Sequence, residues 1–391
     1  MIKTNTITIG GGISGISFHQ ELNRAGVENL VIEKDKDGGC IDTQTYKDFW
    51  FEMGAHTIYN SYSNTIDFIK KNKVENNIAA RNKLPFLLVK PNNNIESIFK
   101  NLNFFSLAYN YIKNRKISKN DKTVKEYASK LFGESNYNNT LKYCFNAVLS
   151  QSSQDFPMEY LFKKYDRDTS IPRSFTLKNG LSNIIKNSQI SSIKENVLKI
   201  SYTQNKQWLI TTDKTSYTAQ RVCLATPWNT TKELLKDILP NIAKHKYSPT
   251  MSELINIAIV VNKEKLKHIK SLAGLIGKDQ FFFSAVSRDV IDHSDYRAIV
   301  FHCHKNISQE NLIDRISILL KIRKLDILYS YQKTNLLPCY HRNHNIFLKD
   351  LEEELSQISN LYITGNFFDR LAIENCIRRS NKEANRLIHS L

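Results

Sequence analysis

The sequence predicts an α/β protein in which a nucleotide-binding domain is interrupted by a second domain of mixed helix and sheet. Three observations lead to this fold class. A short strand pattern at Thr6–Ile9 runs directly into glycines and then into a helical pattern. Alternating strand patterns return at 197–202 and 208–212, after a long stretch of different character. The 391 residues also exceed what one ordinary core holds, so two domains are expected.

The bulk composition is that of a folded chain. Hydrophobic residues make up 41% and charged residues 24%, which is near the average of globular domains and argues against disorder. Alternation begins at Thr4 and leaves no room for the apolar segment of a signal peptide. The longest apolar run, near Leu254–Val261, is too short to span a membrane. The six cysteines lack CxxC spacing and are expected to be reduced thiols, so we expect a cytoplasmic protein.

The formal net charge of +17 has two explanations. It could attract an anionic partner: a carboxylated substrate, a membrane surface or an acidic protein. It could also reflect a composition rich in Lys, Asn and Ile, because the positive charge is spread widely. The densest run, from Lys113 to Lys125, is typical of a solvated helix face. No recognised nucleic-acid-binding motif accompanies the lysines, so nucleic-acid binding is not predicted. The sequence leaves the oligomeric state open.

The first element is a complete dinucleotide-binding unit. Gly10, Gly12 and Gly15 occupy the three places of G-x-G-x-x-G, directly after the first strand. In such a unit the glycines allow a tight turn, approach of a pyrophosphate and close packing of helix on strand. Residues 16–25 continue as a helix whose N-terminus faces the phosphates, and a second strand at 30–32 ends at Glu33. The Glu33 carboxylate is expected to accept hydrogen bonds from ribose hydroxyls.

The residues that follow indicate which dinucleotide binds. Gly38-Gly39 comes shortly after Glu33, and Glu52-Met-Gly-Ala-His56 follows. With these motifs the sequence resembles the FAD-binding superfamily that contains protoporphyrinogen oxidase, flavin amine oxidases, phytoene desaturases and UDP-galactopyranose mutase. Amine oxidases usually carry Arg after the glycine pair, where this chain has Cys40. Gly38–Thr43 instead obeys the G-G-x-I-x-T/S pattern of protoporphyrinogen oxidases.

The resemblance continues through the chain in the family's order. The matching segments are Pro172–Ile185 ("GGL..L"), Arg221–Pro227 ("vvlAtP"), Leu337–His341 ("lP.Y"), Leu361–Asn366 and Leu371–Ile377. Gly365-Asn366 is typical of protoporphyrinogen oxidases, where amine oxidases usually have Gly-Glu. The chain departs from the pattern at Phe368–Arg370, where glycine is expected, so the turn near the flavin must differ. The last helix is amphipathic from Ile373 onward.

The resemblance implies a Rossmann-like FAD-binding domain (GR2-type) with an inserted mixed helix-and-sheet substrate domain. The FAD domain comprises 1–75, 166–245 and 335–391, and the substrate domain comprises 76–165 and 246–334. Residues 61–165 are expected to be mostly helical. Strands are expected at 254–261, 281–287 and 298–304. FAD is expected to bind non-covalently, with these residues at the cofactor: Gly10, Gly12, Ile13, Ser14, Gly15, Glu33, Lys34, Gly39, Cys40, Gly54, Ala55, His56, Val197, Ala225, Thr226, Gly365, Asn366, Ala372 and Ile373.

The resemblance points to His56 as the candidate catalytic residue, because the family's matching segment borders the flavin ring. A flavin needs little help to accept a hydride, so His56 either transfers a proton or only packs and hydrogen-bonds there. His302 and His304 share one strand face and are expected to line the substrate cavity, with the core as the alternative. Tyr331 could supply an aromatic wall of that cavity.

Arg173 could meet a substrate carboxylate or lie on the surface. Cys339, His341 and His344 lack the spacing of a zinc site, so no metal is predicted. The sequence thus predicts an FAD-dependent oxidase, dehydrogenase or desaturase that oxidises a C–N or C–C bond of a small or carrier-bound metabolite. A mutase-like isomerase that uses reduced flavin, or a non-catalytic FAD-binding protein, remains an alternative.

Overall fold

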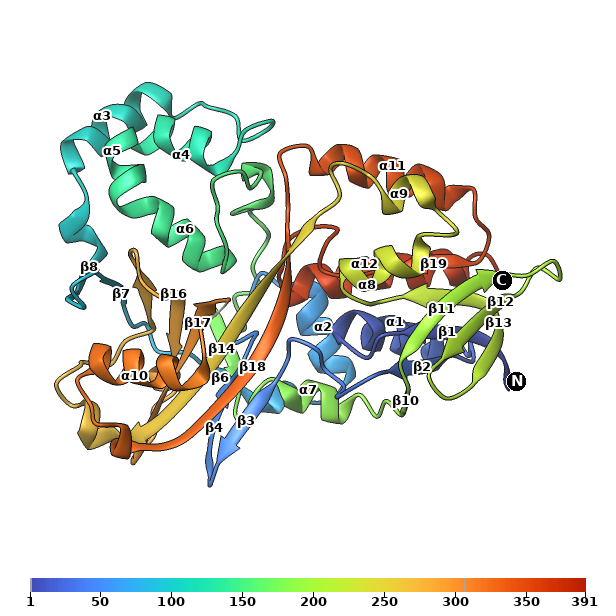
Figure 1. The fold of residues 1–391 in the computed structure, drawn as a ribbon, viewed down its shortest axis with the longest axis horizontal. Coiled ribbons are helices and arrows are strands. Elements are labelled where there is room, and N and C mark those ends of the chain that lie inside the picture. The colour runs from blue at the N-terminus through green and yellow to red at the C-terminus, as the bar shows by residue number, and fades with distance from the viewer. Residues whose placement is uncertain (1, 306) are drawn as a thin grey trace.

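The computed structural model describes residues 2–305 and 307–391. Two large sheets lie at opposite ends of the molecule, and helices cover both (Figure 1). Two long strands of the second sheet, β14 (Thr250–Asn262) and β18 (Ile327–Cys339), run diagonally through the middle of the view. No helix in these described ranges is long and apolar enough to cross a membrane.

The first sheet is mainly parallel. Its parallel strands are β1 (Ile2–Ile9), β2 (Leu30–Glu33), β10 (Ser192–Lys194), β13 (Ser216–Leu224) and β19 (Leu361–Ile363). An antiparallel hairpin of β11 (Val197–Tyr202) and β12 (Trp208–Thr212) extends it, in the order β10-β2-β1-β13-β12-β11. β19 pairs with the end of β13 that β12 leaves free. The strand, glycine turn and helix predicted at the N-terminus therefore form the centre of this sheet.

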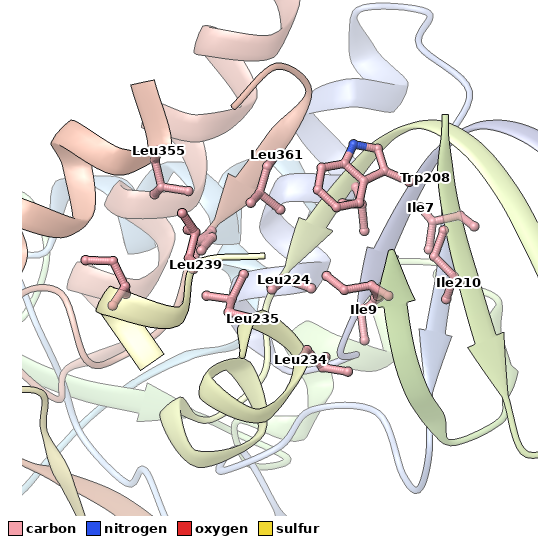
Figure 2. Packing of buried hydrophobic residues seen from close by; sticks show 14 of the residues in the cluster. Ile7, Ile9, Trp208, Ile210, Leu224, Leu234, Leu235, Leu239, Leu355 and Leu361 are labelled. Carbon is pink, nitrogen blue, oxygen red and sulfur yellow. The ribbon is translucent and has the colours of Figure 1, made fainter. Parts of the chain in front are cut away.

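Both faces of the first sheet are buried, because alternate residues of its strands point to opposite faces. On one face Val222 and Leu224 pack with Trp208 and with helices α8 (Trp228–Leu235), α9 (Pro240–Ala243) and α11 (His344–Ser356) (Figure 2). On the other, Cys223 packs with α1 (Ile13–Arg24) and α12 (Ile373–Ile388). Gly26 ends the α1 segment with a φ of +71°, as its position predicts.

The second sheet has the order β18-β14-β17-β16-β15-β7-β8. Its other strands are β17 (Tyr296–His304), β16 (Phe282–Ser287), β15 (Gly274–Gly277), β7 (Phe86–Val89) and β8 (Ile95–Ser97). Helix α10 (Gln309–Leu320) covers one face, where Ile299, Phe301 and Cys303 are buried. The opposite face holds Val300 and contacts the N-terminal segment at Phe51 and Met53.

A helical region lies between β8 and β9 in the sequence. It contains α3 (Phe104–Asn114), α4 (Val124–Phe132), α5 (Glu134–Asn136), a π-helical turn (Tyr137–Leu141) and α6 (Lys142–Leu149). It has a small core of its own around Phe145 and Phe156. Helix α6 joins it to the second sheet, because Tyr143 packs on Leu88 and Ile276. The expectation that 61–165 is mostly helical holds for 104–149 but missed three short strands: β6 (Ile78–Ala80), which pairs with the distant β9, and β7 and β8, which form a local hairpin whose β7 pairs with the distant β15.

The remaining elements are short. They are α2 (Ser63–Lys71), α7 (Ser182–Asn187), the hairpin β3 (Thr43–Tyr46) and β4 (Phe49–Glu52), the strands β5 (Ile58–Tyr59) and β9 (Ser174–Leu177), and 3₁₀ turns at Glu75–Asn77, Ile98–Asn101, Met158–Tyr160, Lys263–Leu266, Arg288–Val290 and Lys324–Asp326. Strand β9 pairs with both β5 and β6. Strand β18 ends at Cys339, so it crosses the boundary between 334 and 335 at which the sequence analysis divided the expected substrate domain from the expected FAD domain.

Candidate active site

The turn between β1 and α1 is closely packed at two glycines and open at a third. An added Cβ would lie 2.6 Å from the Ala225 carbonyl oxygen at Gly10 and 1.9 Å from the Gly10 carbonyl oxygen at Gly15. At Gly12 an added Cβ would meet no atom of the described chain within 4 Å. Gly12 is also the N-cap of α1 and has no side chain to cap the free N–H groups. The turn thus presents amides and a positive helix end to open space, as a pyrophosphate site requires.

The second glycine pair lies against this turn. The Gly38 N–H donates to the Gly11 carbonyl at 2.8 Å. An added Cβ at Gly39 would lie 3.3 Å from the Gly12 Cα. This contact is tight, and the φ of +60° at Gly39 strains any residue with a side chain, so the segment after β2 borders the open space on its other side.

The Glu33 carboxylate borders the same space from the end of β2. It accepts from the Gly11 N–H at 2.6 Å and from the Asp35 N–H at 2.9 Å. These two bonds fix its orientation beside the glycine turn, where a ribose would lie. Lys34 is exposed and lies 3.7 Å from the Asp35 carboxylate. Val197 begins β11, on the hairpin that extends the sheet, and pairs with Thr212.

The ends of β13 and β19 reach the glycine turn as well. The Ala225 N–H donates to the Ile9 carbonyl at 2.8 Å, and the Thr226 methyl would lie 3.4 Å from a Cβ at Gly10. Gly365 follows β19 with a φ of +153°, and an added Cβ there would lie 3.6 Å from the Thr226 carbonyl oxygen. Five further predicted cofactor residues lie near these strand ends: Ile13 packs with Ile373, Ser14 lies in the first turn of α1, Ala372 caps α12, and the Asn366 carbonyl accepts from the Tyr340 hydroxyl.

The segment Gly54–His56 lies beside Cys40. The Ala55 N–H donates to the Cys40 carbonyl at 3.1 Å, and an added Cβ at Gly54 would lie 2.1 Å from the same oxygen. The Cys40 side chain is exposed. The two motifs that carried the family resemblance are therefore neighbours in space, at one edge of the contact between the two sheets.

Four polar side chains, which we call the polar row, lie side by side across the second sheet: Lys333 on β18, Asn256 on β14, His302 on β17 and Ser284 on β16. Residues directly opposite each other in a sheet point to the same face. Val300, two residues before His302, packs with Met53 on that face, so the polar row is turned toward the N-terminal segment. The predicted alternation of His302 with Val300 is thus present.

The polar row holds the N-terminal segment through hydrogen bonds. The Lys333 Nζ donates to the Gly39 carbonyl at 2.9 Å and contacts the Asp42 carboxylate at 3.0 Å. The Asn256 Nδ2 donates to the Met53 carbonyl at 2.6 Å, while its Oδ1 is buried without a partner in the described chain. His302 Nδ1 lies 2.9 Å from the Ser284 Oγ. Strands of the second sheet therefore set the position of both family motifs.

His56 lies between this face and Arg81. Burial lowers the pKa of His56 to about 3, and the positive charge of Arg81 and the nearby His302 add to the effect. Burial likewise lowers the pKa of His302 to about 4. Both imidazoles are neutral at pH 7 and are weak bases. The environment of His56 consequently favours hydrogen bonding and packing over proton abstraction.

A cavity of about 30 Å³ opens beside His56, large enough for one carboxylate-sized group. Its charged lining consists of Glu52, Arg81 and Arg288. The Arg81 Nε is buried and has no hydrogen-bond partner in the described chain, and burial lowers the pKa of this guanidinium. Arg288 is already engaged: it donates to the Trp50 carbonyl at 2.9 Å and lies over the Trp50 ring.

Glu52, the carboxyl group in this cavity, balances only part of the positive charge of Arg81 and Arg288. Glu52 accepts from the Leu181 N–H at 2.6 Å and from the Thr43 Oγ1 at 2.9 Å. Burial nevertheless raises the pKa of Glu52 to about 7, so a substantial fraction is protonated at neutral pH. With two guanidinium groups against one partly neutral carboxyl group, the cavity favours an anion.

The other residues predicted to line the substrate site lie apart from this cavity. Tyr331 lies two residues before Lys333 on β18 and packs, partly buried, against the hydrophobic cluster that contains Val300. His304 contacts the Gln280 carbonyl at 3.2 Å and borders a separate pocket of about 500 Å³. Arg173 is exposed, in front of β9. Within the described residues no group of three His, Cys, Asp or Glu side chains could hold a metal ion.

Comparisons with known proteins agree with this architecture. The family model described as "NAD(P)-binding Rossmann-like domain" matches residues 8–71. Among solved structures, a protein of Exiguobacterium sp. 255-15 to which protoporphyrinogen oxidase activity has been attributed superposes with a TM-score of 0.80 at 15% identity, covering 99% of both chains. Cyclohexylamine oxidase from Brevibacterium oxydans IH-35A gives a TM-score of 0.72 at 14% identity and 99% coverage of both.

Reduced UDP-galactopyranose mutase gives a TM-score of 0.73 at 14% identity, over 99% of this chain and 96% of the mutase. The chain shares the fold of these solved structures. Among curated proteins, an uncharacterized protein in the nifH2 3′ region of Methanothermococcus thermolithotrophicus is 35% identical over 52 residues. That match spans 13% of this chain and about half, 51%, of the relative's length.

The residues present fit an FAD molecule in this fold. Open space at Gly12, uncapped amides at the start of α1 and the oriented Glu33 carboxylate suit the pyrophosphate and ribose. At the opposite end, the Asn256 Nδ2 contacts the Met53 carbonyl beside the second family motif, and its Oδ1 is a buried acceptor without a partner in the described chain. Hydrogen-bond donors and acceptors are thus present both at the glycine turn and at the polar row.

Sequence reasoning missed Arg81, Asn256, Lys333 and Ser284. One signal was present: Asn256 is the single polar residue in the apolar run Leu254–Val261, and a buried polar residue in a central strand usually has a specific partner. Arg81 carried no such signal, because it follows a short strand in a segment read as helical. Lys333 was one of many lysines in a basic chain.

Proposed function

We propose that the protein is an FAD-dependent oxidoreductase that oxidises a C–N or C–C bond of a small or carrier-bound metabolite. The observation that carries the proposal is the juxtaposition of the open glycine turn, Glu33 and the motif residues Cys40 and Gly54–His56 along one continuous edge. FAD would be held non-covalently by the nineteen cofactor residues named from the sequence, together with Asn256. The Cys40 thiol lies at the Gly38–Gly39 end of that edge, which argues against covalent attachment.

Bound FAD would supply a hydride acceptor at its flavin ring. The chain's own contribution is to position the donor carbon and to exclude water. Neutral His56 and His302 can donate or accept hydrogen bonds there without adding charge. Asn256 offers an acceptor, and Val300 and Phe51 supply apolar surface.

The absorption spectrum of the purified protein, measured before and after denaturation, tests the proposed cofactor. We expect the two-band spectrum of oxidised flavin, with FAD released into the supernatant on denaturation. Anaerobic addition of candidate amines and unsaturated acids should then bleach the spectrum in the presence of a true substrate. A colourless protein that cannot be reconstituted with FAD contradicts the proposal.

We further propose that the substrate carries an anionic group, held by Arg81. The buried Arg81 Nε lacks a partner, and the cavity beside it fits a carboxylate but not a ring. The test is calorimetric titration of the FAD-loaded protein with butyrate and with its neutral isostere butyramide. Butyrate should bind at least tenfold more tightly, and Arg81→Gln should abolish the difference. Arg173→Gln, which removes the same charge from the surface, is the matched control and should behave as wild type.

Each outcome of this titration identifies which proposal fails. A flavin-free protein contradicts the proposed function itself. A flavin-loaded protein that binds butyrate and butyramide alike contradicts the anionic substrate only. Equal butyrate binding by the wild type and Arg81→Gln shows that another cation holds the anion.

A mutase-like isomerase is the second candidate, favoured by the histidine of the Gly54-Ala55-His56 segment and by the superposition with the mutase. Such an enzyme needs reduced flavin but consumes no net oxidant. Turnover that appears only after dithionite reduction would identify it. A flavin that no candidate substrate reduces, and that supports no isomerisation, would indicate a non-catalytic FAD protein. We propose a cytoplasmic location, because all six cysteines are free thiols.

A further inference from the structure

Helix α3 is apolar, but none of its residues is buried. Phe105 is 92% exposed, Ile112 71% and Tyr109 64%, and these three share one face at i, i+4 and i+7. Phe104 and Tyr111 adjoin them, and Phe99 of the preceding 3₁₀ turn is 68% exposed. We call these six residues the α3 patch: Phe99, Phe104, Phe105, Tyr109, Tyr111 and Ile112. Contiguous exposed apolar surface of this kind marks an interaction site.

The face of α3 that contacts the rest of the protein carries, beside Leu107, polar side chains that form hydrogen bonds. The Asn114 Nδ2 donates to the Lys130 carbonyl on α4 at 2.9 Å. The Asn103 side chain caps the helix by accepting from the Ser106 N–H at 3.0 Å, and its own N–H donates to the Asn136 Oδ1 at 2.7 Å. These bonds fix α3 with its polar side inward. The α3 patch is therefore held outward by the fold, at the outer edge of the helical region (Figure 1).

The chain segment that carries the α3 patch is basic, and Glu96, which accepts from the Asn101 Nδ2, lies just before it. From Ile98 to Asn120 the chain contains Lys100, Lys113, Arg115, Lys116 and Lys119, and no Asp or Glu. Two copies of the patch would therefore repel each other in a twofold contact, which argues against a second copy of this chain as the partner. An acidic protein would neutralise the lysines, but its carboxylates would leave the six adjacent aromatic and aliphatic side chains without an apolar partner.

We propose that the α3 patch docks the protein onto the surface of an anionic membrane. Aromatic and aliphatic side chains backed by Lys and Arg on one helix are the combination that lies in the headgroup region. Anionic lipid of the cytoplasmic leaflet attracts each nearby basic residue. The docked protein is peripheral and needs no spanning segment. This inference is independent of the proposed redox function, and it assigns part of the +17 charge to a specific partner.

Co-sedimentation of the full-length, FAD-loaded protein with vesicles tests the proposal. The two vesicle types are pure phosphatidylcholine and phosphatidylcholine with 30 mol% phosphatidylglycerol as probe. We expect strong binding to the anionic vesicles only. The double variant Phe105→Ser/Ile112→Ser should bind them at least tenfold more weakly, because each lost side chain removes a buried apolar contact. The matched control is Leu325→Ser/Ile318→Ser, at residues 88% and 66% exposed elsewhere, which should bind within about twofold of wild type.

A charge variant separates the two contributions. Lys113→Gln/Lys116→Gln should weaken binding to anionic vesicles by about fivefold per lysine and make it less sensitive to salt. An unchanged circular dichroism spectrum and Tm in all variants shows that the fold is intact. Absence of binding to anionic vesicles overturns the proposal, and so does equal binding by the patch and control variants. A dimer in light scattering that only the patch variant dissociates would instead identify a second copy as the occupant.

Discussion

Gly12 and Gly15 lie in one turn, but their surroundings predict opposite phenotypes. At Gly12 the backbone is extended, with φ −73° and ψ 175°, and a side chain meets open space. Gly12→Val should leave the apoprotein folded, with a Tm within about 2 °C of wild type, and block FAD retention. Gly15→Val places a side chain against the Gly10 carbonyl and should cost more than about 2 kcal/mol of stability. Flavin absorbance and thermal unfolding measure both, and a fully flavinated Gly12→Val protein contradicts the phosphate site.

Glu52 predicts a pH dependence of stability. Burial raises the pKa of Glu52 to about 7 from the ordinary 4.5, so between these values the folded protein binds a proton that the unfolded chain has released. The free energy of unfolding therefore falls as pH rises through this window, by roughly 3 kcal/mol for the full shift. The lowered pKa values of His56 and His302 act in the opposite direction below pH 6.5.

Urea unfolding of apoprotein with and without Glu52→Gln isolates the carboxyl contribution. The histidines are common to both proteins and cancel in the difference. Glutamine keeps an acceptor for the Leu181 N–H and cannot ionise. The variant should gain stability relative to wild type as pH rises from 5 to 7.5. A difference that is constant over this range would mean that Glu52 titrates normally.

Local chemistry decides which site residues could be predicted. Gly10, Gly12, Gly15 and Glu33 act through a turn and two adjacent strands, so their spacing in sequence reports their geometry. Arg81 becomes distinctive only because the fold buries its Nε without a partner. Burial of that kind depends on contacts between segments far apart in the chain, and a single sequence does not encode them in any short pattern.

At the scale of elements, Glu374 joins the first turns of two helices. It lies at the start of α12, is 3% exposed, and accepts from the Thr65 N–H and Oγ1 at 2.9 Å and from the Asn64 Nδ2 at 2.7 Å at the start of α2. A carboxylate at a helix N-terminus is also favoured by the helix dipole. Glu374→Ala leaves these buried donors unsatisfied and should lower stability by roughly 3 kcal/mol.

Thermal unfolding of Glu374→Ala checks this contribution. FAD retention should fall as well, because α12 begins beside the glycine turn. Lys382→Ala on the same helix removes a 63% exposed charge and should change stability by less than about 0.5 kcal/mol. A Glu374→Ala protein with wild-type Tm would mean that water replaces the carboxylate at no cost.

Elements differed in how well the sequence predicted them. Strands β14, β16 and β17 and helix α12 were confirmed, because each is long or strongly periodic. Strands β6, β7 and β8 were missed, because each is three or four residues long, and β6 and β7 join their sheets by pairing with β9 and β15, far along the chain. The polar row was missed for the same reason: it requires the register of four strands.

At the scale of the whole molecule, Lys333 links the second sheet directly to the N-terminal segment that follows β2. From β18 it reaches the Gly39 carbonyl and the buried Asp42 carboxylate. Burial pushes the pKa of Asp42 up, but Lys333 and Lys36 outweigh it and hold this pKa below its usual range. Asp42 therefore adds stability above pH 4 that is lost as pH falls through the lowered pKa.

Lys333→Met removes the counter-charge and leaves a carboxylate that is 2% exposed with the exposed Lys36 and the Gln44 amide as its partners. We expect a loss of roughly 3 kcal/mol at pH 7 and weaker FAD retention, because the segment after Gly39 loses its support from the second sheet. Lys349→Met, at a 74% exposed surface pair on α11, is the control and should be neutral. Adding FAD should restore part of the lost Tm, since a ligand bound only by the folded state stabilises it by mass action. A variant with wild-type stability and wild-type FAD affinity would show that the Lys333–Asp42 ion pair contributes nothing to the contact between the two sheets.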